Sequence, residues 1–263
     1  MSQALRSFRA GAGSTPAPRI GCAGWSLGSA HPSQFPAAGT HLQRYAAVFN
    51  AVEINSSFYR PHRTDTYRRW SDSVPEDFRF SAKLPRSITH EHRLIAATAL
   101  LDRFLAEVSA LGSKLGALLI QLPPSLAYAE RHAAAFLHAL RERYAGGLCL
   151  EPRHATWFSA AATALLCEYR IGRVGADPAL SPAAAVPGAA AALCYTRLHG
   201  SPRMYWSDYA PEQLQAIARR VRGEHERGAD SWCIFDNTAA GHALGNALEL
   251  RGLLQPAAAP TRC

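Results

Sequence analysis

The sequence predicts an α/β fold, and within that class a TIM (β/α)8 barrel with a short or irregular sixth helix. Two observations lead to this prediction. Short apolar runs alternate along the chain with amphipathic helical patterns, and polar residues gather at the C-terminal end of nearly every run. An open, doubly wound sheet is the competing architecture. It loses support because no G-x-G-x-x-G follows the first run and no G-x-x-x-x-G-K-[ST] is present.

Eight strands are expected in chain order, each rich in β-branched or other apolar residues. Their ranges are 20–25, 51–55, 78–83, 115–121, 147–153, 171–177, 193–199 and 231–237. Apolar stripes at helical spacing lie between them. The stripes run through Leu42, Tyr45, Val48 and Phe49; Leu101, Phe104, Leu105, Val108 and Leu111; Phe136, Leu137, Leu140 and Tyr144; Leu214, Ile217 and Val221; Leu244, Ala247, Leu248 and Leu254. Proline and alanine in 178–192 allow only a short or irregular connection.

The chain of 263 residues fits one domain over 19–255. Residues 1–18 and 256–263 are rich in Gly, Ala, Ser and Pro, which is typical of flexible tails. No apolar run reaches the roughly 18 residues of a membrane span, and the N-terminus lacks the apolar region of a signal peptide. We therefore expect a cytoplasmic protein without a membrane partner.

Cysteines and net charge narrow the setting further. The six cysteines form no C-x-x-C and lie at no metal-ligand spacing from histidine. We expect them to be small buried apolar residues in a reducing compartment. The net charge of +8 favours an anionic partner, either a small molecule or single-stranded nucleic acid.

A carboxylate in the run Val52-Glu53-Ile54 raises the question of its partner, because an isolated charge in a dry core costs several kcal/mol. Alternate strand residues share a face, which places Glu53 with Asn55 near a strand end. The same rule places three further sets each on one face of its own strand: Arg79, Ser81 and Lys83; Glu151 and Arg153; Tyr195, Arg197 and His199. The equivalent ends of the fourth, sixth and eighth strands carry Gln121, Asp177, and Asp236 followed by Asn237. Structural ion pairs and helix caps are the alternative explanation for these charges.

The series IGCAGWS, VEINSSFYR, FRFSAKLPRSITH, LGALLIQLPPS, LEPRHATWF, YTRLHGS and IFDNTAAGHALGNA resembles the successive motifs of the YecE-like proteins, domain of unknown function family 72. The resemblance covers about residues 19–254 and implies a TIM barrel, while the family's biochemical role is not established. Cys22, Ala23, Pro152 and Asp236 depart from the usual motifs. The positions that match them are Glu53, Asn55, Tyr59, Arg60, Lys83, His90, Gln121, Glu151, Arg153, Trp157, Arg197, His199 and Asn237.

These residues favour an enzyme, a hydrolase or isomerase, acting on an anionic and phosphate-bearing substrate at the barrel mouth. Glu53 or Glu151 would be the general base and His199 the acid. Arg153, Arg197 and Lys83 would hold the anion, since guanidinium groups match phosphate well. The remaining positions, Asn55, Tyr59, Arg60, His90, Gln121, Trp157 and Asn237, would bind or orient the substrate.

Two alternatives stay open, and the oligomeric state is not readable from the sequence. No cofactor is predicted, but a divalent metal could be held by Glu53, Glu151, His199 and Asp236. A protein that binds nucleic acid without catalysis would instead use the positive charge and the loop aromatics Trp25, Phe58, Tyr59, Trp157, Tyr205, Trp206 and Tyr209.

Overall fold

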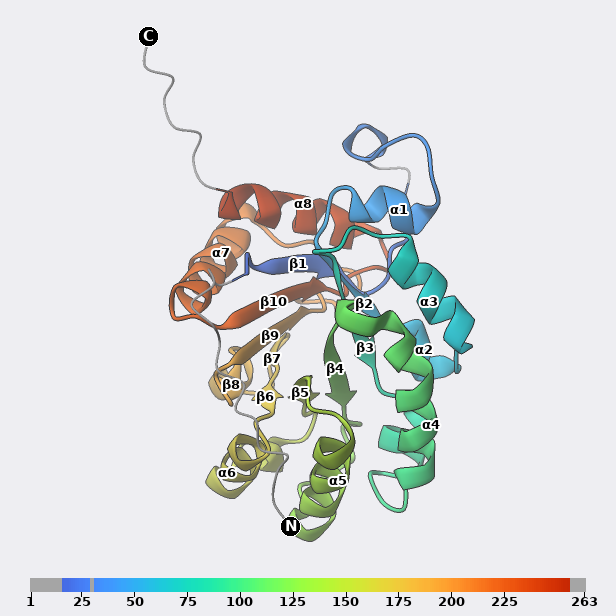
Figure 1. Cartoon of the computed structure of the whole chain (residues 1–263). Coiled ribbons are helices and arrows are strands. Elements are labelled where there is room, and N and C mark those ends of the chain that lie inside the picture. Colours follow the sequence, from blue (N-terminus) through green and yellow to red (C-terminus); the bar gives the residue numbers. More distant parts are fainter. Residues whose placement is uncertain (1–15, 29–30, 256–263) are drawn as a thin grey trace.

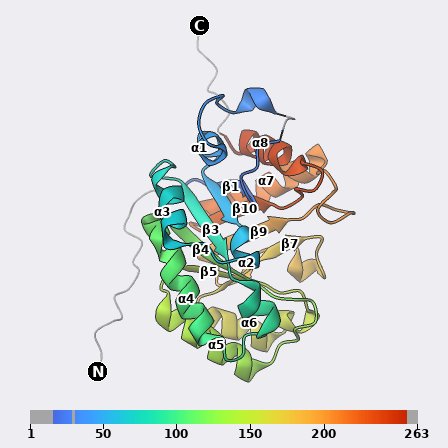
Figure 2. The ribbon, with the colours of Figure 1, turned by 90° about the vertical axis from the view of Figure 1, so that its right-hand side faces the viewer.

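Parallel strands surrounded by helices make up the described part of the chain, residues 16–28 and 31–255 of a computed structural model. Figure 1 shows the helices arranged around the strands, and in the view of Figure 2 the strands run between α3 and α4 on one side and α7 and α8 on the other. The expected tails fall mostly outside the described residues. Pro18, within the expected N-terminal tail, is described, and its carbonyl accepts a hydrogen bond from Asn50.

All eight expected strands are present, and the sixth is divided into two short pieces. The strands are β1 (Arg19–Cys22), β2 (Ala51–Ile54), β3 (Arg79–Lys83), β4 (Leu115–Gln121), β5 (Gly147–Glu151), β6 (Gly172–Arg173), β7 (Gly175–Asp177), β8 (Gly188–Ala189), β9 (Leu193–Leu198) and β10 (Asp230–Phe235). The region expected to be irregular, 178–192, holds the antiparallel β8 and a single turn of 3₁₀ helix, Pro182–Ala184. That expectation is confirmed.

Each apolar stripe corresponds to a helix, and three further helices lie outside the stripes. The helices are α1 (His41–Ala46), α2 (Ser56–Tyr59), α3 (Thr64–Asp72), α4 (Thr98–Val108), α5 (Glu130–Arg143), α6 (Ala160–Glu168), α7 (Pro211–Glu226) and α8 (His242–Leu254). Pro211 occupies the first turn of α7, where its missing N–H has no cost. Shorter helical turns cover Pro32–Gln34, Ser87–Glu91, Ser109–Lys114 and Ala155–Phe158.

The strands form two parallel-rich sheets whose edges meet at two places. One sheet has the order β1-β10-β9-β7 and the other β2-β3-β4-β5-β6-β8. The sixth strand passes from one sheet to the other, because β6 pairs with β5 and β7 pairs with β9. On the opposite side, a backbone bridge between Ala23 and Glu53 joins the ends of β1 and β2. The architecture is therefore α/β and barrel-like.

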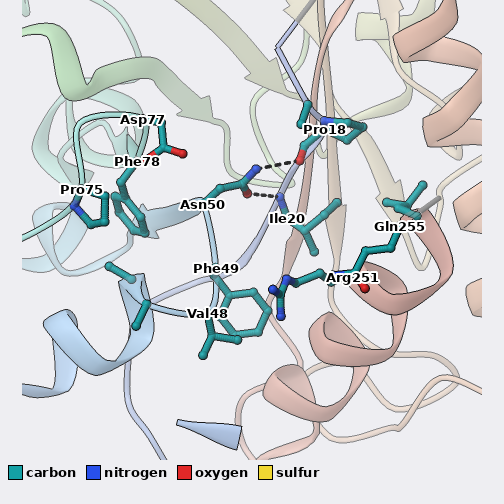
Figure 3. Close-up of a pocket in the computed structure, with 14 residues that line it drawn as sticks. Pro18, Ile20, Val48, Phe49, Asn50, Pro75, Asp77, Phe78, Arg251 and Gln255 are labelled. Carbon is teal, nitrogen blue, oxygen red and sulfur yellow. Dashed lines mark hydrogen bonds between the residues drawn. The ribbon is translucent and has the colours of Figure 1, made fainter. Parts of the chain in front are cut away.

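Side chains fill the seam between β1 and β2 below that bridge. The Tyr45 hydroxyl accepts from the Cys22 amide at 2.8 Å and donates to the Ala51 carbonyl at 3.0 Å. Asn50 accepts from the Ile20 amide and donates to Pro18, as Figure 3 shows. These polar side chains replace a strand ladder and satisfy the backbone groups along the seam.

The strands enclose an apolar cluster that is separate from the larger core between strands and helices. Its members are Ala51, Ala117, Leu119, Cys149, Val174, Leu193, Tyr195, Trp232 and Ile234. Two residues beyond several of these positions stand charged or polar residues on the same face, as the strand period of two requires. Ala51 is followed in this way by Glu53, and Cys149 by Glu151. The inner face is thus apolar at the N-terminal ends of the strands and ionic at their C-terminal ends.

The structure bears on two further expectations, the burial of the cysteines and the lack of a membrane span. The cysteines are not uniformly buried, because Cys167 is exposed and Cys194 is half-buried, both lying at helix or strand positions that face outward. In the described part of the chain, no helix has the length and apolar character that crossing a bilayer demands.

Candidate active site

Arg197, near the end of β9, is the centre of a buried ionic cluster. Its side chain is 1% exposed. Nε and Nη2 donate to the two oxygens of Glu53 at 3.0 and 2.7 Å. Nη1 donates to Glu151 Oε2 at 2.7 Å, and Nη2 also donates to Asp236 Oδ2 at 2.9 Å. One guanidinium therefore holds three carboxylates that arrive from β2, β5 and the end of β10.

This arrangement supplies the partners of the buried Glu53 carboxylate. Arg197 binds both carboxylate oxygens, and the Tyr195 hydroxyl donates to Oε2 at 3.0 Å. Ser81 on β3 shares a hydrogen bond of 2.6 Å with the same hydroxyl. With all of its partners inside the protein and no exposed surface, Glu53 orients Arg197.

His199 lies between two carboxylates of the cluster. Its Nδ1 is 3.0 Å from Asp236 Oδ2, and its Nε2 is 3.0 Å from Glu151 Oε1. Arg153 Nη2 is 2.6 Å from the same Glu151 oxygen and 2.9 Å from Nε2. A cationic ring donates to both carboxylates, whereas a neutral ring with bare Nε2 accepts from Arg153. The two arrangements differ by one proton, which is the property that acid–base chemistry uses.

Electrostatics shift the pKa values of Glu151, Asp236 and Arg197 in the direction that favours their charged forms. Burial raises the pKa of Glu151, but the charges of Arg197, Arg153 and His199 outweigh it and hold that pKa well below the usual range. The pKa of Asp236 is lowered as well, since Arg197 and His199 overcome its burial. Burial lowers the pKa of Arg197, yet the three carboxylates raise it well above its ordinary value.

The edge of the cluster that faces solvent has a different composition from its interior. Glu53, Glu151 and His199 have no exposed side-chain surface, while Arg153 is 13% and Asp236 is 8% exposed. Asp236 Oδ2 is bound by Arg197 and His199, but Oδ1 makes no hydrogen bond with any described residue. Asp236 therefore presents one open carboxylate oxygen toward solvent, where a substrate proton can reach it.

Lys83, at the end of β3, belongs to the same edge. Its ammonium lies 4.1 Å from the centre of the Phe58 ring and makes no hydrogen bond or ion pair with a described residue. Burial and the charge of Arg197 lower the pKa of Lys83 to about 8, although nearby carboxylates raise it. The group thus exchanges protons near neutral pH.

Five other predicted residues lie at the C-terminal strand ends around this edge. Asn55 is half-buried, its Oδ1 has no partner, and it lines a cavity of about 410 Å³ with Trp25, His41 and Ser56. Tyr59 is 72% exposed and Arg60 is exposed. The His90 ring packs on Phe58, and burial followed by Lys83 and Arg86 lowers its pKa. Gln121 is half-buried at the end of β4.

Trp157 and Asn237 serve loop packing instead of facing the mouth. Trp157 is 1% exposed and donates its indole N–H to the Leu126 carbonyl at 2.9 Å. Asn237 has no exposed surface and donates to the Ser207 carbonyl and to Asn246 Oδ1. Both side chains thus contact loops in the structure, while Asn237 Oδ1 is buried without a hydrogen-bond partner among the described residues.

The sequence analysis considered Asp236 as a cap or a metal ligand, and Tyr205 only as one of the loop aromatics that could stack on nucleic acid. Tyr205 is 42% exposed, and its ring lies edge-on to His199 with centroids 5.8 Å apart. The position of Asp236 at a strand end was a usable signal. Tyr205 lies in an irregular loop, where periodicity gives no signal.

A metal ligand set is not formed by the predicted carboxylates. Within 16–28 and 31–255, no three His, Cys, Asp or Glu side chains are arranged to hold a metal ion. The physical reason is that the Arg197 guanidinium occupies the space between Glu53, Glu151 and Asp236. A cation at that position repels a divalent ion.

The fold and the cluster define an α/β protein with ionisable groups gathered at the C-terminal ends of parallel strands. The model of the family described as "Protein of unknown function DUF72" matches residues 19–262. The chain belongs to the DUF72 family.

Relatives agree with this membership. The UPF0759 protein YecE of Escherichia coli K12 is 33% identical over 141 residues, 53% of this chain and 50% of YecE, so the match spans about half of that relative's length. A DUF72 family protein from Thermotoga maritima superposes with a TM-score of 0.75 and 24% identity, covering 90% of this chain and 99% of its own. The 3-keto-D-glucoside 4-epimerase YcjR of E. coli has a TM-score of 0.56 and 14% identity, with 90% and 98% coverage. These likenesses to solved structures concern the fold.

Proposed function

We propose that the chain closes into a (β/α)8 barrel and is an enzyme that moves protons on an anionic, phosphate-bearing substrate at the mouth of the strands. One observation carries the proposal. Polar atoms inside the cluster are paired, whereas four polar atoms at the C-terminal strand ends have no partner among the described residues: Arg153 Nε and Asn55 Oδ1, which are buried, and Asp236 Oδ1 and Lys83 Nζ. Unpartnered polar groups at a site are expected to find their partners in a ligand.

The contacts distribute the roles as follows. Arg153 and Lys83 attract the anion, because they are the cations of the cluster that reach its edge. Asp236 Oδ1 accepts the substrate proton, and Glu151 and His199 share protons behind it. Arg197, which the sequence suggested as an anion holder, has its donors engaged by carboxylates and positions them. Isomerisation and hydrolysis both use anion-binding cations and proton-transferring side chains of this kind.

A second candidate, binding of single-stranded nucleic acid, is favoured by the exposed aromatics near the mouth. Tyr59 is 72%, Tyr205 42% and Trp206 45% exposed. The guanidinium of Arg203 lies 4.4 Å above the Trp206 ring. Bases stack on such platforms, and the net charge of +8 attracts the backbone.

Binding of inorganic phosphate and of phosphorylated metabolites, followed by calorimetry, tests the leading proposal. Arg153→Met should weaken the binding by about tenfold or more, because a charge-assisted hydrogen bond contributes roughly 1.5–3 kcal/mol. Arg68→Met, an exposed arginine on α3, is the matched control. Unchanged binding by Arg153→Met would remove the anion site from the mouth. Salt-steep binding of a labelled oligonucleotide that needs Trp206 and shows no turnover would favour the second candidate.

A further inference from the structure

Lys83 differs from the other lysine of the chain in the partners of its ammonium. Only Lys83 and Lys114 occur in the sequence. The Lys114 ammonium donates to the Ser71 and Val74 carbonyls at 2.7 and 2.8 Å. Lys83 makes no such bond with any described residue, although the cluster contains three carboxylates, because Arg197 binds all of them. Its amine is therefore available for chemistry.

The surroundings of Lys83 favour the neutral amine. Phe58 covers the ammonium on one side. The charged and titratable groups that act on it come from every neighbouring element: Glu53 on β2, His90 in the turn Ser87–Glu91, Glu151 on β5, Arg197 on β9 and Asp236 after β10. Burial and Arg197 outweigh the carboxylates and lower the pKa to about 8. At pH 7 the neutral fraction is thus roughly a hundredfold or more above that of an ordinary lysine.

We infer that Lys83 is a nucleophile that forms an imine with the carbonyl carbon of the substrate. The substrate class is then an aldehyde or ketone that also bears a phosphate or similar anionic group. This inference rests on the proposed acid–base function and sharpens it: Lys83 helps to attract the anion while protonated and takes the carbonyl in its neutral form, and Arg153 holds the anion throughout.

The lone pair of the neutral Lys83 amine forms a C–N bond with the carbonyl carbon, and one of the two amine protons passes to the carbonyl oxygen to give a carbinolamine. The hydroxyl then takes up a second proton, the C–O bond breaks and water leaves. Nitrogen loses its second proton to yield the imine, so the two amine protons balance the two protons of the water. Once protonated, the imine draws electrons from the adjacent carbon and acidifies its C–H. Asp236 Oδ1, the open carboxylate oxygen of the edge, is the group that accepts this proton.

Pyridoxal 5′-phosphate is a suitable probe, since it combines an aldehyde with a phosphate. The whole chain is incubated with the probe and reduced with sodium borohydride, and the modified lysines are mapped by peptide mass spectrometry. Lys114 and the N-terminal amine of the same molecule are internal controls, so the result needs no variant. Pyridoxine 5′-phosphate, which has an alcohol in place of the aldehyde, reports anion binding separately.

We expect modification of Lys83 to exceed that of Lys114 by at least about tenfold at pH 7, because the neutral amine is the reactive form. The yield should rise with pH through a midpoint of about 8. Lys83→Arg should abolish the modification at this position, and Lys114→Arg should retain it. Excess pyridoxine 5′-phosphate should protect Lys83.

Two results would overturn the inference, and they are distinguishable. If pyridoxine 5′-phosphate binds through Arg153 while Lys83 is modified no more than Lys114, the imine is wrong and the anion site stands. If neither ligand binds in an Arg153-dependent way, the proposed function fails together with the inference.

Discussion

Arg197 is the residue on which the cluster depends, because three buried carboxylates share its guanidinium. A buried ion pair adds little net stability relative to an apolar pair, but removal of one partner leaves uncompensated charge and is strongly destabilising. Here one cation binds three anions, so its loss would leave carboxylates on β2, on β5 and after β10 without their compensating charge. The residue therefore couples the strand ends that carry the site.

Arg197→Met should destabilise the protein at pH 7 by about 3–5 kcal/mol in urea unfolding, as for other broken buried pairs. Wild-type Glu151 and Asp236 have lowered pKa values, so their stabilisation is present above the ordinary carboxylate pKa and is lost only as the pH falls through the lowered values. Without Arg197 these pKa values rise. The variant should accordingly become more stable as the pH falls from about 7 to about 5, a range over which the stability of the wild type changes little.

Arg68→Met serves as the control for loss of one positive charge, because Arg68 is exposed and pairs only with exposed Asp65. If Arg197→Met has the same free energy of unfolding as the wild type at pH 7, or becomes less stable as the pH falls toward 5, Arg197 does not stabilise the three carboxylates as argued.

At the scale of elements, the seam between β1 and β2 depends on side chains where a strand ladder is missing. Tyr45 of α1 bridges the two strands, and backbone pairing resumes only at Ala23 and Glu53, beside the cluster. The helix thus positions the strand that presents Glu53.

Tyr45→Phe should lower the free energy of unfolding by about 2–4 kcal/mol, because a buried amide and a buried carbonyl lose their partner. Tyr67→Phe is the matched control: Tyr67 is equally buried, but its hydroxyl has no hydrogen-bond partner among the described residues. We expect that control to be neutral or slightly stabilising. Equal losses for the two variants in chemical denaturation would refute the bridging role.

The loop between β9 and α7 is held by a chain of polar contacts from α8. Asn246 donates to Asp208 Oδ1 at 2.7 Å and accepts from Asn237 at 2.8 Å. Asn246→Ala should speed amide hydrogen exchange in 203–208 by about tenfold, since a lost buried bond contributes about 1–1.5 kcal/mol to closure. Glu249→Ala, an exposed position on the same helix, should leave exchange unchanged. Exchange that does not differ between the two variants would show that other contacts hold the loop.

At the scale of the whole molecule, the two ends of the strands have different characters. A cavity of about 500 Å³, larger than the one at the mouth, lies at the N-terminal ends among Pro18, Phe49, Phe78 and Arg251 (Figure 3). The ionic cluster lies at the C-terminal ends, where barrel enzymes carry their active sites. The larger cavity and the ionic cluster therefore lie at opposite ends of the strands, and the proposed site is the one with the ionisable groups.

Arg251→Met, in the larger cavity, should change phosphate affinity by less than about twofold, whereas Arg153→Met should cost about tenfold. The two variants remove the same charge from opposite ends, so calorimetric titration under one set of conditions separates site-specific binding from the effect of net charge. A larger loss for Arg251→Met would move the anion site to the N-terminal end.

The sequence by itself determined the order of the eight expected strands and of five of the helices, because the periods of two and of 3.6 are local properties of the chain. It also determined which face Glu53, Glu151 and Arg197 share, since alternation along a strand needs no partner. Only the tertiary structure decided what those residues do. In the structure Arg197 binds three carboxylates, Trp157 and Asn237 make hydrogen bonds to loop residues, and Asp236 Oδ1 and Lys83 Nζ have no hydrogen-bond partner among the described residues. The reason is that hydrogen-bond saturation and burial depend on residues more than a hundred positions apart, which no local pattern records.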